Sequence, residues 1–273
     1  MSFLIYKNLA NAVSILGVLP LCILFRESGY QYLIPLIVYN NVMDDLDGIL
    51  AARLNIKSEF GALLDNVCDA ISHTILIMVV GMHFGGLCIV AGLIGAMAVV
   101  LRSVSRMVPA RAAGTGSPTN ELIRHILFIL LLAELFEFST GPVLIAAFLL
   151  HSVSMLVPYK LPYLIRGMTK SHVAIGLVNV ALAIAWLVPE STAIIAACFI
   201  LPYQYSLSSA FIKKATSVDA ATSVSAASCA SFNSLQRSIS TQEQLDGACG
   251  ELESQCASDG TEMKPQDEGT TAG

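Results

Sequence analysis

Charged residues are scarce in this sequence, at 13% of 273 residues, whereas a soluble domain carries about 25%. The seven cysteines show no paired spacing of the kind that binds a metal, and the apolar run after Lys7 has no convincing cleavage site of a signal peptide. Hydrophobic residues make up 55% of the chain, and its mean hydropathy is +0.70. Together these proportions exclude an ordinary soluble domain and indicate a polytopic membrane protein.

The charge is unevenly distributed along the chain. The net charge is -5, but nine acidic and only two basic residues follow Lys214, so the apolar body is slightly basic. The last segment lacks apolar periodicity and is rich in Ser, Thr, Ala and Gln, so we expect a disordered tail over 215–273. Residues 1–8 are expected to form an N-terminal interfacial helix, and 9–214 the membrane domain.

Apolar segments separated by turn residues follow one another through the body of the chain. A helix needs about 20 residues to cross about 30 Å of hydrocarbon, and eight segments approach this length: 9–25, 31–52, 60–82, 85–105, 121–138, 141–159, 172–188 and 191–212. We therefore predict an all-α integral membrane protein with about eight transmembrane helices. With eight spans, every Lys and Arg of the body except Arg26 falls on one side. That side is cytoplasmic by the positive-inside rule, so we expect both termini in the cytoplasm, at a bacterial inner membrane.

Four aspartates lie in the second and third of these segments: Asp44, Asp47, Asp65 and Asp69. An ionised Asp near the bilayer centre costs roughly 2.5–3.5 kcal/mol, so the group requires a compensating partner such as a cation. The first two are three residues apart and the last two four apart, which places each pair on one helix face. The short link Arg53–Ser58 makes the two helices antiparallel neighbours with these faces turned toward each other. Oxygen ligands select hard cations such as Mg²⁺ or Mn²⁺, and four carboxylates could hold two ions, which suits phosphoryl chemistry.

The simplest alternative is that these are helix-end carboxylates, solvated or paired with Arg53 and Lys57. Small residues beside them favour a ligand site instead, because they leave room for a ligand between closely packed backbones: Gly48, Ala51 and Gly61. Asp45 points about 100° away from the shared face, and we expect it either to support the site or to be solvated.

The aspartates and small residues form one pattern, Asp44-x2-Asp47-Gly48-x2-Ala51 followed by Gly61-x3-Asp65-x3-Asp69. It resembles the signature of the CDP-alcohol phosphatidyltransferase family, D-x2-D-G-x2-A-R-x8-G-x3-D-x3-D, with seven fixed positions matching over 26 residues. One position departs, because Ala52 stands where the signature has Arg. The next residue, Arg53, could supply the charge from a rotated position.

The resemblance implies transfer of a phosphatidyl group from CDP-diacylglycerol to a small polar alcohol, with release of CMP. It implies that Asp44, Asp47 and Asp65 hold metal ions, and that Asp69 is the general base and available as a further metal ligand. By the same resemblance, four residues of this stretch would bind the substrate: Gly48, Ala51, Arg53 and Gly61. The CDP moiety would lie in the region of Gly48 and Ala51. The expected partners are the lipid bilayer and a second copy of the chain in a homodimer, and no nucleic acid is expected.

Weaker likenesses favour the phosphatidylserine synthase branch of the family. They are eight spans in place of six, and short stretches at Ser58-Glu-Phe-Gly61, Leu101-Arg102, Gly116-Ser-Pro118 and Pro158-Tyr-Lys160. Serine is therefore the favoured acceptor, although residues 114–125 depart from that branch. The same reaction with inositol phosphate or glycerol phosphate is the alternative.

Polar residues near the helix ends complete the candidate site. Five residues are candidates to bind substrate phosphates or an acceptor carboxylate: Arg102, Arg106, Arg111, Arg124 and His125. Arg102 and Arg124 are preferred because they lie closest to helix ends, and ordinary juxtamembrane charge is the alternative for each. Asn120 is expected to cap the N-terminus of the fifth helix. His73, one turn after Asp69, could touch the site, although a packed polar residue is the commoner reason for such a histidine.

Two other functions are compatible with the aspartates. A divalent-cation transporter would use them as an ion path, but they cluster toward one side and the far halves of these segments are apolar. An inactive family member with a scaffolding role is suggested only by Ala52.

Overall fold

The computed structural model describes part of the chain: residues 8–107, 118–156, 172–209 and 212. The chain divides into two compact units, Met1–Phe211 and Ile212–Gly273, and every described residue except Ile212 belongs to the first. Regular structure in the described residues is entirely helical, as predicted. The expected disordered tail, all but Asn8 of the interfacial helix, and Arg111 lie outside the described residues.

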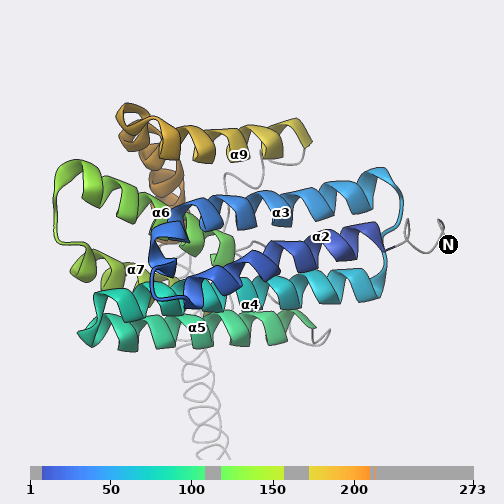
Figure 1. The fold of residues 1–273 in the computed structure, drawn as a ribbon, viewed down its shortest axis with the longest axis horizontal. Coiled ribbons are helices and arrows are strands. Elements are labelled where there is room, and N and C mark those ends of the chain that lie inside the picture. The colour runs from blue at the N-terminus through green and yellow to red at the C-terminus, as the bar shows by residue number, and fades with distance from the viewer. Residues whose placement is uncertain (1–7, 108–117, 157–171, 210–211, 213–273) are drawn as a thin grey trace, which may run out of the picture. The chain divides into compact units, whose positions relative to one another are not determined.

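Each predicted apolar segment contains a helix (Figure 1). The elements in chain order are α2 (Leu9–Val18), the 3₁₀ helices η1 (Leu19–Phe25) and η2 (Gly29–Tyr32), α3 (Leu33–Arg53), α4 (Glu59–Phe84), α5 (Gly86–Met107), α6 (Pro118–Phe136), α7 (Thr140–Leu156), α9 (His172–Leu187) and a helix over 189–209. Among the described helices, α4 and α5 are long and apolar enough to cross a membrane by length and composition. The number of eight spans stays a prediction.

The first apolar segment is not one continuous α-helix. α2 ends at Val18, and the chain tightens into η1 with Pro20 in its first turn. Since Pro20 has no N–H, it cannot donate the bond to the Leu16 carbonyl that a continuing α-helix requires. The Leu16 carbonyl instead accepts a hydrogen bond from the Tyr39 hydroxyl of α3 at 2.9 Å, which attaches α2 to α3.

A short link joins α3 to α4 and reverses the chain. Asn55 adopts a left-handed conformation with φ of 53°, and the Ser58 hydroxyl caps α4 by accepting a hydrogen bond from the Gly61 N–H at 3.0 Å. The two helices run antiparallel, as predicted. However, α2 lies between them and packs more extensively on each than they pack on one another (Figure 1). Side chains of α2 therefore reach the space between the two aspartate faces.

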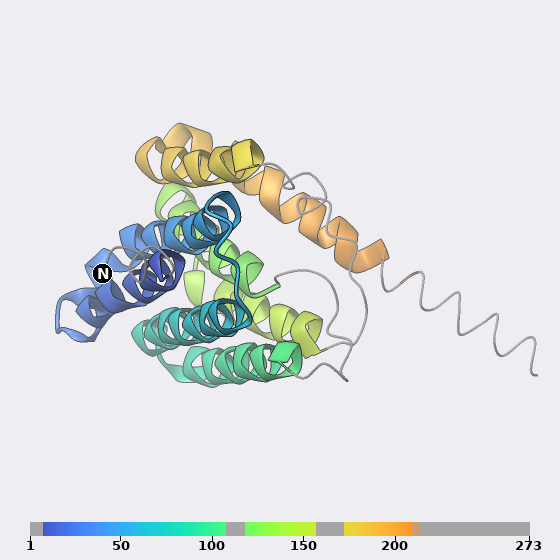
Figure 2. The same ribbon diagram turned by 90° about the vertical axis from the view of Figure 1, so that its right-hand side faces the viewer.

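α4, which carries Asp65 and Asp69, packs closely on α5 (Figure 2). A methyl group added to Gly81 would lie 3.1 Å from the Cys88 carbonyl oxygen, and one added to Gly92 would lie 3.4 Å from that of Ile77. Such glycines let helix backbones approach closely. Phe148 of α7 is fully buried and fills the space beside Gly92, so α4, α5 and α7 form one packed layer.

Candidate active site

Three aspartates from two helices meet at one point. Asp44 of α3 and Asp65 and Asp69 of α4 each place a carboxylate oxygen so that all three atoms lie within 4.8 Å of one another. Asp65 and Asp69 share a face because they are one helical turn apart. Like charges at this separation repel one another unless a proton or a cation lies between them. Half-buried carboxylates in this arrangement fit a hard divalent cation.

Asp47 lies differently from its three partners in the signature. It is only 5% exposed, and its carboxylate accepts a hydrogen bond from the Ser14 hydroxyl of α2. It does not belong to the group of three carboxylates. The sequence offered no sign of Ser14, which is one small hydroxyl residue in an apolar segment. The metal-binding role of Asp47 stays a prediction, and one of its oxygens is held by the protein.

Asn120 reaches the cluster from α6. Its side-chain amide donates a hydrogen bond to the Asp44 carboxylate at 2.6 Å. The prediction that Asn120 caps this helix is wrong, because α6 begins two residues earlier, at Pro118. Proline favours the first helical position, where its missing N–H costs nothing, and Asn120 then lies in the first turn with its side chain directed at α3.

Asp45 supports the site and is not simply solvated. Its carboxylate accepts hydrogen bonds from Asn179 of α9 at 2.7 Å and from Asn41 at 3.4 Å. The Asn41 amide also donates to the Asn179 side-chain oxygen at 2.7 Å. Sequence reasoning missed both asparagines, although an amide in an apolar segment was an available signal. Through them α9 is attached to the aspartate-bearing half of α3.

Arg124 belongs to the same network. Its Nε donates to the Asn41 side-chain oxygen at 3.0 Å, and its Nη1 pairs with Glu121 at 3.1 Å. The guanidinium carbon lies 5.9 Å from the ring centroid of Phe199. The structure thus places Arg124 as a buried connection between α6 and α3, and its predicted substrate contact stays a prediction.

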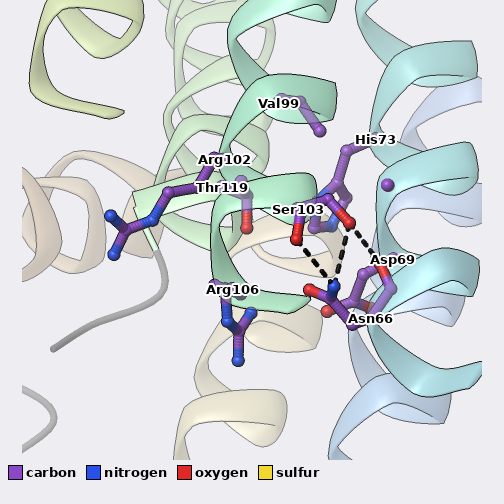
Figure 3. Close-up of a pocket in the computed structure, with 9 residues that line it drawn as sticks. Asn66, Asp69, His73, Val99, Arg102, Ser103, Arg106 and Thr119 are labelled. Carbon is purple, nitrogen blue, oxygen red and sulfur yellow. Dashed lines mark hydrogen bonds between the residues drawn. The ribbon is translucent and has the colours of Figure 1, made fainter. Parts of the chain in front are cut away.

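A small pocket lies beside Asp69, between α4, α5 and α6 (Figure 3). Arg102 and Arg106, one turn apart on α5, line it opposite Asp69. Asn66 holds the two walls together, because its amide donates to the carbonyl and the hydroxyl of Ser103 at 3.1 and 2.9 Å. Both arginines thus line the same pocket as the predicted base, although the Arg102 guanidinium is directed away from Asp69 (Figure 3). Two arginines in the lining suit a site for an anionic group.

His73 also lines this pocket. It is 3% exposed, and its Nδ1 has no hydrogen-bond partner among the described residues. Its place in the pocket lining agrees with the interpretation that His73 faces the site, and its burial agrees with the alternative of a packed polar residue.

Arg53 is not brought to the carboxylates. It is the exposed last residue of α3, and it follows Asp44 by nine residues, which is about 180° around the helix axis. In the described part of the chain it has no ion pair. The side chain of Ala52 carries no charge, and the role of Arg53 at the signature position stays a prediction.

The two signature glycines have different surroundings. A methyl group at Gly48 would meet nothing within 4 Å, whereas one at Gly61 would lie 3.0 Å from the Asn11 side-chain oxygen of α2 and from the Ser58 hydroxyl. Gly61 therefore allows α2 to approach α4, and Gly48 leaves space open beside the aspartates. Ala51 is half-buried on the same helix as Gly48.

The stretch that contains these residues matches a known family. Residues 7–158, more than half of the chain, match the family model described as CDP-alcohol phosphatidyltransferase. The chain belongs to the CDP-alcohol phosphatidyltransferase family. Members of this family are membrane-bound transferases of substituted phosphate groups and generally depend on divalent metals. The match includes all four signature aspartates, whereas Asn179 lies beyond it.

A short stretch of the chain is also similar to another protein. An uncharacterized protein of Aquifex aeolicus (strain VF5) is 41% identical over 49 residues. The matched stretch is 18% of this chain and 25% of the relative, so the chain covers only a quarter of the length of that protein.

Proposed function

We propose that the protein transfers a phosphatidyl group from CDP-diacylglycerol to the hydroxyl of a small polar alcohol and releases CMP. The observation that carries this proposal is the convergence of Asp44, Asp65 and Asp69 within 4.8 Å. It is strengthened by Arg102 and Arg106, which line the pocket beside Asp69. A carboxylate cluster next to an arginine-lined pocket suits a reaction in which one phosphate-bearing group is bound and another is released.

The three converging carboxylates would hold Mg²⁺ or Mn²⁺, and Asp47 would join them for a second ion. A bound cation supplies neutralisation of the pyrophosphate charge and of the charge that develops on the leaving CMP. The donor set fits, because it consists of carboxylate oxygens from two antiparallel helices.

Asp69 is the residue that we assign as general base. It belongs both to the carboxylate cluster and to the wall of the pocket, so it can face an acceptor alcohol. As the hydroxyl oxygen attacks the phosphorus that carries the diacylglycerol, its proton passes to Asp69. The bond from that phosphorus to the bridging oxygen breaks, and CMP leaves with the electron pair.

The other substrate contacts follow from the same arrangement. The open space beside Gly48 and the adjacent Ala51 would accommodate the CDP moiety. Arg102 would pair with a phosphate or with the carboxylate of the acceptor. We favour serine as the acceptor, as in the phosphatidylserine synthase branch, with inositol phosphate or glycerol phosphate as the alternative.

The proposed setting is a bacterial inner membrane. The chain would cross it with eight spans, carry the site on the cytoplasmic side and form a homodimer.

The deciding experiment measures CMP released by the purified full-length protein in detergent. CDP-diacylglycerol and Mn²⁺ or Mg²⁺ would be supplied with serine, inositol phosphate, glycerol phosphate or no acceptor. The proposal expects metal-dependent CMP release that requires an acceptor and is greatest with serine. The matched variants are Asp69→Asn, expected inactive, and Glu190→Gln, an exposed acidic position expected to be active. No CMP with any acceptor would overturn the enzyme proposal, and metal uptake into proteoliposomes without turnover would favour transport instead.

A further inference from the structure

A second polar cluster lies buried between α6, α7 and the helix over 189–209. Its aromatic members are His125, His151 and Tyr203, which are 5%, 1% and 3% exposed. The ring centroids of the two histidines are 4.8 Å apart, and each lies within 5.0 Å of the Tyr203 centroid. The proposed transfer reaction assigns no role to these side chains.

A hydrogen bond to a backbone carbonyl determines the tautomer of His125. Its Nδ1 lies 2.6 Å from the carbonyl oxygen of Glu121, so Nδ1 carries the proton and donates it. The Nδ1 atom of His151 is buried and has no hydrogen-bond partner among the described residues.

Each imidazole has one buried ring nitrogen without a hydrogen-bond partner among the described residues. His125 Nε2 and His151 Nδ1 are both buried and lack a hydrogen-bond partner in the described part of the chain. A buried polar atom without a partner costs about 1–3 kcal/mol. A histidine that binds a metal through one ring nitrogen usually donates its other N–H to a backbone carbonyl or a carboxylate, and His125 has this arrangement.

The spacing of the two rings also fits a shared ion. A Zn²⁺–N bond is about 2 Å long, so two imidazoles on one tetrahedral ion have ring centroids about 5 Å apart. The observed separation is 4.8 Å. Two further buried oxygens of the same region have no partner among the described residues, namely Ser206 Oγ and Glu121 Oε2. Glu121 precedes His125 by one helical turn, so the two side chains lie on one face of α6.

We propose that His125 Nε2 and His151 Nδ1 bind a transition-metal ion such as Zn²⁺, at a site separate from the carboxylate cluster. Imidazole ligands favour Zn²⁺ and its neighbours, whereas carboxylates favour Mg²⁺ and Mn²⁺, so the two sites select different ions. Asp44, Asp65 and Asp69 form the group of three whose ligand atoms converge within 4.8 Å among the described residues. The remaining positions around the ion would be filled by water.

The site would join two helices, because His125 is on α6 and His151 is on α7. An ion bound only by the folded protein stabilises that fold by mass action. The ion is thus a structural clamp at the C-terminal end of α7, and its binding is independent of the proposed transfer reaction.

The test measures zinc retained by the full-length protein after loading with Zn²⁺ and desalting. The proposal expects a stoichiometric amount of zinc in the wild type and its loss in the double variant His125→Gln and His151→Gln. Two controls should retain it: His83→Gln, which alters an exposed histidine stacked on Tyr30, and Asp65→Asn in the carboxylate cluster. Zinc that persists in the double variant, or that never binds to the wild type, would overturn the proposal and leave a buried water as the occupant.

A second measurement needs no variant. Co²⁺ replacing Zn²⁺ at a site with imidazole ligands gives visible d–d absorption bands, and these are much weaker for six oxygen ligands. We expect such bands on Co²⁺ titration of the wild type, with Mg²⁺ present in excess to occupy the carboxylates. A featureless spectrum under these conditions would contradict the proposal even if the double variant failed to fold.

Discussion

The hydroxyl of Ser14 donates a hydrogen bond to the carboxylate of Asp47. This contact joins α2 to α3 inside the signature stretch, and it is possible because α2 lies between α3 and α4 (Figure 1). Asp47 is therefore a structural partner of α2 in the described structure, besides being a predicted metal ligand. The two roles can be separated by experiment.

Replacing Ser14 by Ala leaves a buried carboxylate without this donor. We expect a loss of about 1–3 kcal/mol of stability, measured as a lower midpoint of thermal unfolding in detergent. Ser105→Ala is the matched control, since the partner of the Ser105 hydroxyl among the described residues is the Leu101 carbonyl of its own helix. Equal midpoints for the two variants would show that the contact contributes nothing to stability.

The roles of Asp69 and Asp65 should differ in a metal titration. Asp69→Asn removes the proposed base, and we expect CMP release to fall by about 10²–10⁴-fold at any Mn²⁺ concentration. Asp65→Asn removes a proposed ligand only, so part of the lost activity should return as Mn²⁺ is raised. If high Mn²⁺ restored Asp69→Asn as well, Asp69 would be a metal ligand without a role as base.

Asn179 is the contact that α9 makes with the site from beyond the matched family region. Asn179→Ala removes its hydrogen bonds to Asp45 and Asn41, and we expect a several-fold rise in the Mn²⁺ concentration that gives half-maximal CMP release. Asn179→Asp should be more damaging, because it sets a second carboxylate against Asp45. If Asn179→Asp released CMP at the same Mn²⁺ concentrations as the wild type, the contact would have no role in positioning α3.

Gly48 and Gly61 provide a matched pair of substitutions. Gly61→Ala should lower stability, since its Cβ would lie 3.0 Å from two oxygens. The methyl group added by Gly48→Ala would have no atom within 4 Å. Because the change replaces a glycine within a helix, stability should rise by about 0.5–1 kcal/mol. If the open space receives the CDP moiety, Gly48→Ala should nevertheless raise the KM for CDP-diacylglycerol. An unchanged KM would place that moiety elsewhere.

Ala52 and Arg53 test the one departure from the signature. Because Arg53 is exposed and about 180° from Asp44 around α3, Arg53→Gln should leave the KM for CDP-diacylglycerol nearly unchanged. Ala52→Arg places a guanidinium at the signature position and should lower that KM. A large loss in Arg53→Gln would show that Arg53 replaces the missing arginine.

Spacing along the chain determines the helices and the central chemistry of this protein. Apolar segments bounded by turn residues are sufficient to predict helices, because a helix satisfies its own backbone hydrogen bonds. The pairing of Asp65 with Asp69 follows from one turn of a single helix, and the family follows from a signature of 26 residues. The same helical spacing correctly aligned His73 with Asp69, although it could not show that both line one pocket.

Contacts between distant segments were decided only by the tertiary structure. Ser14 with Asp47, Asn120 with Asp44, and Asn179 with Asp45 are 33, 76 and 134 residues apart. Each joins two helices whose packing depends on every helix between them, so no periodicity within one segment reveals the partner. The close approach of His125 and His151 has the same origin. The sequence by itself therefore determined the helices and the chemistry of the signature, whereas packing decided which side chains hold its aspartates in place.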